Sequence, residues 1–86
     1  MRFLYFRADW CGVCHAKGPV AREIALDRDL PLEVLDIETE AGGAEAERRR
    51  IRTVPTLALV EGERVRFRLI GEMISPENVS FLMAKL

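Results

Sequence analysis

Two cysteines and a histidine stand together in the segment Cys11-Gly-Val-Cys14-His15, and their types and spacing allow two chemistries. C-x-x-C-H is the attachment signature of a c-type haem, in which both sulfurs form thioethers and the histidine binds iron. C-x-x-C beside a strand is also a dithiol redox motif, in which the sulfurs exchange electrons with other disulfides. The two chemistries exclude each other, because a sulfur bound covalently to haem is no longer a thiol.

The rest of the chain disfavours metal and haem sites. His15 is the only histidine, so a second axial haem ligand would have to be Met73 or Met83. Haem attachment generally follows export, and no segment resembles an export signal. A closed zinc site needs four ligands, and there is no second C-x-x-C pair or other histidine to complete one. We therefore predict that the protein needs no metal and no organic cofactor.

Length and composition predict one globular domain over residues 1–86, since 49% of the residues are apolar. The 13 basic and 14 acidic side chains give a formal net charge of −1, so nucleic acid and anionic membranes are not expected partners. The apolar run over residues 3–6 is too short for a signal peptide or a membrane span. We expect a cytoplasmic monomer in which the two cysteines are catalytic rather than structural.

The elements that position the cysteines follow from the hydrophobic pattern. Residues 2–7 are apolar on both faces, which predicts a strand buried on both sides. A helix over residues 13–26 follows, kinked at Pro19, with apolar positions at Val13, Cys14, Val20, Ile24 and Ala25. Further strands are predicted over residues 32–37, 56–60 and 64–69, and further helices over residues 41–50 and 76–86.

Arginines alternate with Val65, Phe67 and Leu69 in the last predicted strand, which indicates one apolar and one solvated face. The order strand, helix, strand, helix, strand, strand, helix predicts an α/β fold, with a four-stranded mixed sheet and helices on both faces. The strand over residues 32–37 is expected at an edge of the sheet. Either Pro31 and Glu33 prevent this edge from pairing, or it pairs with another chain.

Cys11 lies between the first predicted strand and the helix that follows it. The unpaired backbone N–H groups at the start of that helix stabilise an anion. This placement lowers the pKa of the Cys11 thiol and raises its reactive fraction at neutral pH. Cys14 follows about one helical turn later, within reach of the Cys11 sulfur. We predict that Cys11 attacks a partner disulfide and that Cys14 resolves the mixed disulfide. His15 either adds positive charge near these sulfurs or is an ordinary exposed helix residue.

The segment Trp10-Cys11-Gly12-Val13-Cys14 resembles the W-C-G-P-C active site of the thioredoxin family. Pro19 falls where that family has a helix-kinking proline, residues 53–56 (TVPT) resemble its cis-proline segment, and Gly71 matches a glycine beside that proline. The resemblance covers residues 2–86, without the family's leading strand and helix. It implies a thioredoxin-like fold with strand order 2-1-3-4 and a cis peptide bond before Pro55.

The resemblance also implies an enzyme, a thiol–disulfide oxidoreductase that acts on protein disulfides and is recharged by a reductase. Its substrate groove would be lined by four residues around Cys11: Trp10, Val54, Pro55 and Gly71. Two alternatives stay open. One is a glutaredoxin-like enzyme that uses glutathione, which shares the T-V-P segment. The other is a non-catalytic binding module that uses the same groove for a partner.

Several residues depart from the family's pattern and are predicted to modulate the dithiol, together with Gly12 and His15. Tyr5 stands where the family usually has a buried aspartate, and Val34 stands where it has the paired lysine. The usual proton relay is therefore absent, and we predict slower resolution by Cys14 unless a water or the Tyr5 hydroxyl substitutes. Val13 replaces the proline between the cysteines, which predicts a less negative redox potential than that of thioredoxin.

Two charged segments have less specific interpretations. Glu72 either biases the groove against acidic surfaces or is a solvated turn residue. The run Arg48 to Arg50 is expected to be a solvated helix face, with a favourable pair between Glu45 and Arg49, rather than a nucleic-acid patch.

Overall fold

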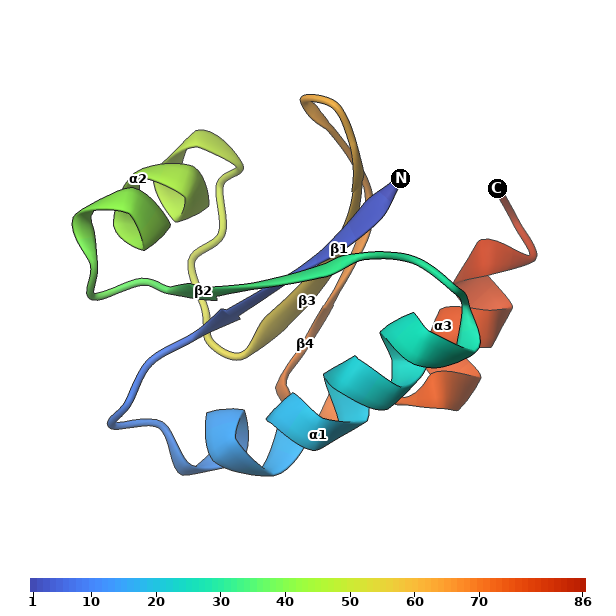
Figure 1. Ribbon diagram of the computed structural model, residues 1–86, viewed down its shortest axis with the longest axis horizontal. Helices are drawn as coiled ribbons and strands as arrows, with labels where there is room; N and C mark the ends of the chain where they lie inside the picture. The colour runs from blue at the N-terminus through green and yellow to red at the C-terminus, as the bar shows by residue number, and fades with distance from the viewer.

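The computed structural model describes residues 1–86 as three layers, with a central sheet between helices (Figure 1). The elements follow in the predicted order. They are β1 (Arg2–Arg7), α1 (Gly12–Asp27), β2 (Leu32–Asp36), α2 (Glu40–Arg48), β3 (Thr56–Glu61), β4 (Arg64–Ile70), a short 3₁₀ turn η1 (Gly71–Met73) and α3 (Pro76–Met83). α1 continues through Pro19. No helix is both long and apolar enough to span a membrane.

The four strands form one mixed sheet in the order β2-β1-β3-β4, which confirms the predicted topology. β1 pairs with β2 in parallel and with β3 in antiparallel orientation, so Tyr5 lies between Val34 and Leu57. β3 and β4 form an antiparallel hairpin. β1 therefore sits in the interior of the sheet, which explains why its residues 3–6 are fully buried.

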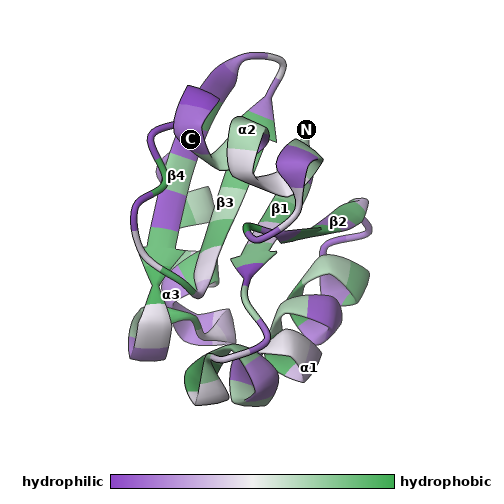
Figure 2. Cartoon of the chain, turned by 90° about the vertical axis from the view of Figure 1, so that its left-hand side faces the viewer, coloured by the Kyte–Doolittle hydropathy of each residue, from purple (hydrophilic) through white to green (hydrophobic).

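Each face of the sheet has its own hydrophobic core. α1 and α3 cover one face, where Phe3 and Tyr5 of β1 pack with Ile24 of α1 and Val79 of α3. α2 covers the other face, where Ala46 packs against alternate residues of the same strands. Figure 2 shows the hydrophobic colouring concentrated in β1 and β3, whereas β4 alternates with hydrophilic residues. The α/β prediction with helices on both faces is thus confirmed.

Side-chain caps fix where the helices begin. Thr39 caps α2 and Ser75 caps α3, each accepting a hydrogen bond from a backbone N–H three residues later, and Pro76 occupies the first turn of α3. α2 ends with the N–H groups of Arg50 and Ile51 donating back to its last turn, at 3.1 and 2.8 Å. Arg50 has a φ of 60° there, the left-handed conformation that favours glycine.

The predicted alternation of apolar and solvated side chains along residues 64–69 is wrong near the start of β4. Leu59 pairs with Phe67 but Val60 pairs with Val65, so Arg66 is an extra residue in β4. This β-bulge shifts the side-chain alternation by one position. Val65 therefore packs with the α2 core, whereas Phe67 packs with the core under α1 and α3.

Two other expectations need correction. Arg49 is not part of a solvated face: it is buried, and its guanidinium donates to Glu45 and to the Gly62 carbonyl oxygen. The helix ends at Arg48, so Arg49 turns inward toward the β3–β4 hairpin, although its predicted pairing with Glu45 is present. Val13, counted among the apolar positions of α1, is exposed, and the buried residues of this helix begin at Cys14.

Candidate active site

Cys11 and Cys14 form a disulfide at the start of α1, with their Cα atoms 5.2 Å apart. Cys11 is the N-cap residue, in an extended backbone conformation, and its sulfur accepts a hydrogen bond from the Cys14 N–H at 3.1 Å. In the reduced protein, the same N–H group and the helix dipole would favour a thiolate at Cys11. Cys14 is almost fully buried, whereas Cys11 keeps 8% of its surface accessible.

The loop before β3 brings a second segment to the dithiol. The Cys11 sulfur lies 3.9 Å from the Val54 carbonyl oxygen, and the peptide bond between Val54 and Pro55 is cis. The Gly71 N–H donates to the Pro55 carbonyl oxygen at 2.9 Å, and Gly71 has a φ of 58°. Val54, Pro55 and Gly71 are therefore held together beside Cys11, although Pro55 itself is buried.

Trp10, the residue before Cys11, extends into solvent. It is 67% exposed, a larger exposed fraction than that of any other aromatic residue. Together with Val13, which is exposed between the two cysteines, it leaves apolar surface uncovered beside the disulfide. Single exposed apolar residues are common, but two next to a cysteine pair favour contact with another molecule.

Tyr5 lies beneath Cys14, where the structure gives it one specific hydrogen bond. Its hydroxyl donates to the Cys14 carbonyl oxygen at 2.6 Å, so the phenol is hydrogen-bonded to the main chain of Cys14 rather than to its sulfur. Burial raises the pKa of the Tyr5 phenol, and the charges of Arg7 and Arg22 oppose that shift. A pocket of about 200 Å³ lies here, lined by Cys14, Tyr5 and Val34 and by the two arginines.

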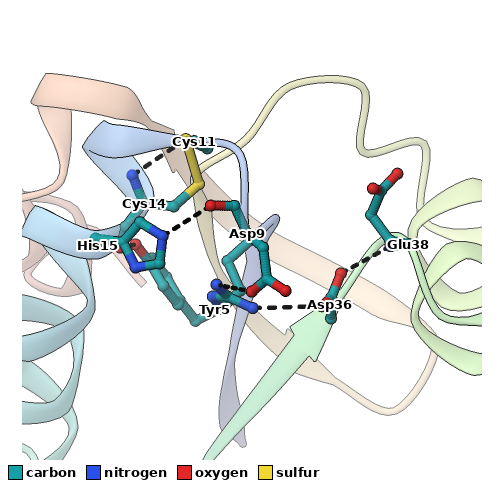
Figure 3. A network of polar contacts seen from close by, with 8 residues as sticks. Tyr5, Asp9, Cys11, Cys14, His15, Asp36 and Glu38 are labelled. Carbon is teal, nitrogen blue, oxygen red and sulfur yellow. Dashed lines mark hydrogen bonds and ion pairs between the residues drawn. A yellow bond between two sulfur atoms is a disulfide. The ribbon is translucent and has the colours of Figure 1, made fainter.

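A charged network, which the sequence analysis did not identify, anchors the loop between β1 and α1 (Figure 3). Arg7, at the end of β1, pairs with Asp9 at 2.6 Å and with Asp36 of β2 at 3.4 Å. The hydrogen bond from Arg7, reinforced by its charge, lowers the pKa of Asp9. His15 Nε2 donates to the Asp9 carbonyl oxygen at 2.9 Å, so His15 ties the helix to this loop. The sequence did contain a signal for this network, because an acidic residue, Asp9, follows two positions after Arg7 at the end of a predicted strand.

Lys17 makes a similar connection on the other side of α1. Its ammonium group donates to the Ile74 carbonyl oxygen at 2.9 Å and lies 3.7 Å from the Glu72 carboxylate. Lys17 is largely buried and Glu72 is 81% exposed. The segment that contains Gly71 is thereby attached to α1, the helix that begins at the cysteine pair.

The largest pocket of the molecule lies beside Val54, between α2 and the loop before β3. It measures about 420 Å³, with Ile37 and Ile51 among its apolar residues and Arg50 and Arg52 among its charged ones. No three His, Cys, Asp or Glu side chains gather so as to hold a metal ion. Gly12 and Val13 lie exposed between the cysteines, at the start of α1.

Comparisons with known proteins match this arrangement. The family model described as thioredoxin matches residues 2–83. A thioredoxin of Pyropia yezoensis is 39% identical over 61 residues, which cover 70% of this chain and 57% of that protein. Thioredoxin 2 of Chlorobaculum tepidum is 30% identical over 74 residues, which cover 86% of this chain and 66% of that protein. The chain thus spans less than two thirds of the length of these relatives.

Among solved structures, thioredoxin 1 of Thermosipho africanus is similar with a TM-score of 0.80 and 27% identity, over 99% of this chain and 92% of that one. Thioredoxin O2 of Arabidopsis thaliana, in the oxidised state, has a TM-score of 0.76 at 24% identity, over 99% of this chain and 73% of that one.

Proposed function

The chain belongs to the thioredoxin family, and from this premise we propose that it is an enzyme that reduces protein disulfides through Cys11 and Cys14. The observation that carries the proposal is the pair itself: two sulfurs joined at a helix start, with the Cys14 N–H directed at the Cys11 sulfur. That hydrogen bond favours charge on the sulfur of Cys11, which is also the more accessible of the two.

The proposed reaction has two exchange steps. The Cys11 thiolate attacks one sulfur of the substrate disulfide, so a mixed disulfide forms and the other substrate sulfur leaves as a thiolate. The Cys14 thiolate then attacks the Cys11 sulfur, which forms the Cys11–Cys14 disulfide and releases the second substrate thiolate. Two electrons pass to the substrate, and a reductase returns them to the enzyme. No metal or organic cofactor takes part in either step.

We assign substrate contact to the surface made by Trp10, Val54 and Gly71, with Pro55 buried beneath it as the residue that joins Val54 to Gly71. An extended substrate segment would pair with the main chain of Val54, since strand-like pairing gives affinity without dependence on sequence. The exposed indole of Trp10 would cover the apolar side of that segment. We place the reaction in the cytoplasm, where thiols are kept reduced and a dithiol pair is available for exchange.

The test is turnover of a protein disulfide, such as that of insulin, with dithiothreitol as the electron donor. Cys11→Ser should abolish turnover, because it removes the attacking sulfur. Cys14→Ser should stop after the first step and accumulate a mixed disulfide, visible by non-reducing electrophoresis and mass spectrometry. Turnover by Cys11→Ser at the wild-type rate would refute the assignment. Replacing dithiothreitol with glutathione and its reductase tests the glutathione-dependent alternative in the same assay.

A further inference from the structure

The pocket of about 420 Å³ beside Val54 is adjacent to the dithiol but takes no part in the exchange chemistry. Two residues that line it, Ile37 and Val54, also pack against the small cluster that contains both cysteines. One layer of side chains therefore separates the pocket from the disulfide. A substrate segment lying along Val54 would pass its opening.

Two of the arginines near this opening have no ion-pair partner in the chain. Arg48 and Arg49 pair with Glu45, and Arg68 donates to the carbonyl oxygens at the end of α2. Arg50 and Arg52 are exposed, line the pocket, and have neither an ion pair nor a side-chain hydrogen bond. Glu47 is the only carboxylate in the lining. Two free guanidinium groups beside apolar walls suit a carboxylate on an aliphatic stem.

Resting on the function proposed above, we propose that this pocket receives an acidic side chain of the substrate, so that the enzyme selects disulfides flanked by Asp or Glu. Arg52 lies two residues before Val54, and both residues line this pocket. A substrate strand paired with Val54 therefore presents its residue about two positions from the target cysteine to Arg52. Arg50 borders the same pocket and adds the second positive charge.

The two arginines can be removed without disturbing the fold. Arg50 has a φ of 60°, so Arg50→Gly deletes the charge and places the residue best suited to that conformation there. Arg52→Gln removes the second charge at an exposed position. Arg64→Gln is the matched control, since Arg64 is exposed and has no ion pair. Arg64 begins β4, after the turn at the end of β3 that lies opposite to the Val54 loop.

The experiment compares two synthetic peptides that carry the same disulfide, with Glu or with Lys two residues on either side of the target cysteine. The wild-type protein should reduce the Glu peptide with the higher kcat/KM. Each arginine substitution should reduce the Glu-to-Lys ratio by about two- to five-fold, the range expected for a partly exposed ion pair. Arg64→Gln should leave the ratio unchanged, and 0.5 M salt should lower it in the wild type.

The outcomes separate the two proposals. If the wild-type protein reduces both peptides at equal rates, disulfide reduction stands and the acidic preference is refuted. If the double variant Arg50→Gly, Arg52→Gln keeps the wild-type ratio while circular dichroism shows it folded, the pocket is not the source of selection. If the wild-type protein reduces neither peptide nor insulin, the proposed function itself fails.

Discussion

Gly42, in the first turn of α2, is the glycine at which an added Cβ atom would meet the closest neighbour, and replacing it with alanine tests how closely α2 packs against β2. A Cβ atom at this position would lie 2.0 Å from the Asp36 carbonyl oxygen and 2.7 Å from its carbon. Both are backbone atoms at the end of β2, which cannot rotate away as a side chain can. Gly42→Ala therefore forces α2 and β2 apart.

The required displacement sets the size of the effect. An ordinary contact begins at 3.4 Å, so the helix and the strand would have to separate by about 1.4 Å at this point. Such overpacking costs typically 1–3 kcal/mol, and we expect about 3 kcal/mol because the obstacle is backbone. For a domain of this size that corresponds to a melting temperature lower by roughly 12–24 °C. The packing of Ala46 on the sheet would be weakened at the same time.

Gly12→Ala is the matched control, since a Cβ atom there meets nothing within 4 Å. The same substitution at this helical position should leave the free energy of unfolding unchanged or raise it by up to about 1 kcal/mol. Urea and thermal unfolding of both oxidised variants, followed by circular dichroism at 222 nm, measure the difference. A Gly42→Ala protein within 1 kcal/mol of the wild type would refute the close approach of α2 to β2.

Four further predictions concern three side chains. Tyr5→Phe removes the hydrogen bond to the Cys14 carbonyl oxygen and should lower the free energy of unfolding by about 1 kcal/mol. Tyr5→Asp should instead raise the turnover of insulin reduction. No gain in turnover would contradict the account in which the missing aspartate slows resolution by Cys14. The hydrogen bond from Arg49 lowers the pKa of Glu45 below its ordinary 4.5, so this carboxylate stabilises the fold above that pH and the contribution is lost as pH falls through the lowered value. Glu45→Gln should therefore cost roughly 1–3 kcal/mol at pH 7 and flatten the acid limb of stability measured by urea unfolding; an unchanged acid limb would contradict this. Trp10→Ala should change stability by less than about 0.5 kcal/mol because the indole is exposed, but should raise KM for insulin, and an unchanged KM would remove Trp10 from the substrate surface.

The sequence predicted the elements well where the signal is local. The apolar run of β1, the capping sequence Ser75-Pro76-Glu77 and the turn between β3 and β4 each specify their own structure through neighbouring residues. The placement of Cys11 between a strand and a helix follows from the same local patterns. The elements therefore appear in the predicted order, with their ends shifted by a few residues at most.

What could not be predicted depends on contacts between distant residues. Arg49 is buried because the hairpin offers it a carbonyl oxygen at Gly62, thirteen residues later. The pairing of Arg7 with Asp36 depends on β1 and β2 lying in parallel register, which periodicity does not define. The pocket beside Val54 is likewise formed by α2 meeting a loop, so no single segment indicates it.

The extra residue at Arg66 has a consequence for how copies of this molecule meet in concentrated solution. A bulge bends the outermost strand and breaks the regular spacing of its free N–H and C=O groups, so an incoming chain cannot extend the ladder along all of β4. β2, at the opposite border, has no such interruption. Aggregation by strand addition should therefore begin at β2, and a single proline or lysine introduced at Val34, near the middle of β2, should suppress it more than any change on β4.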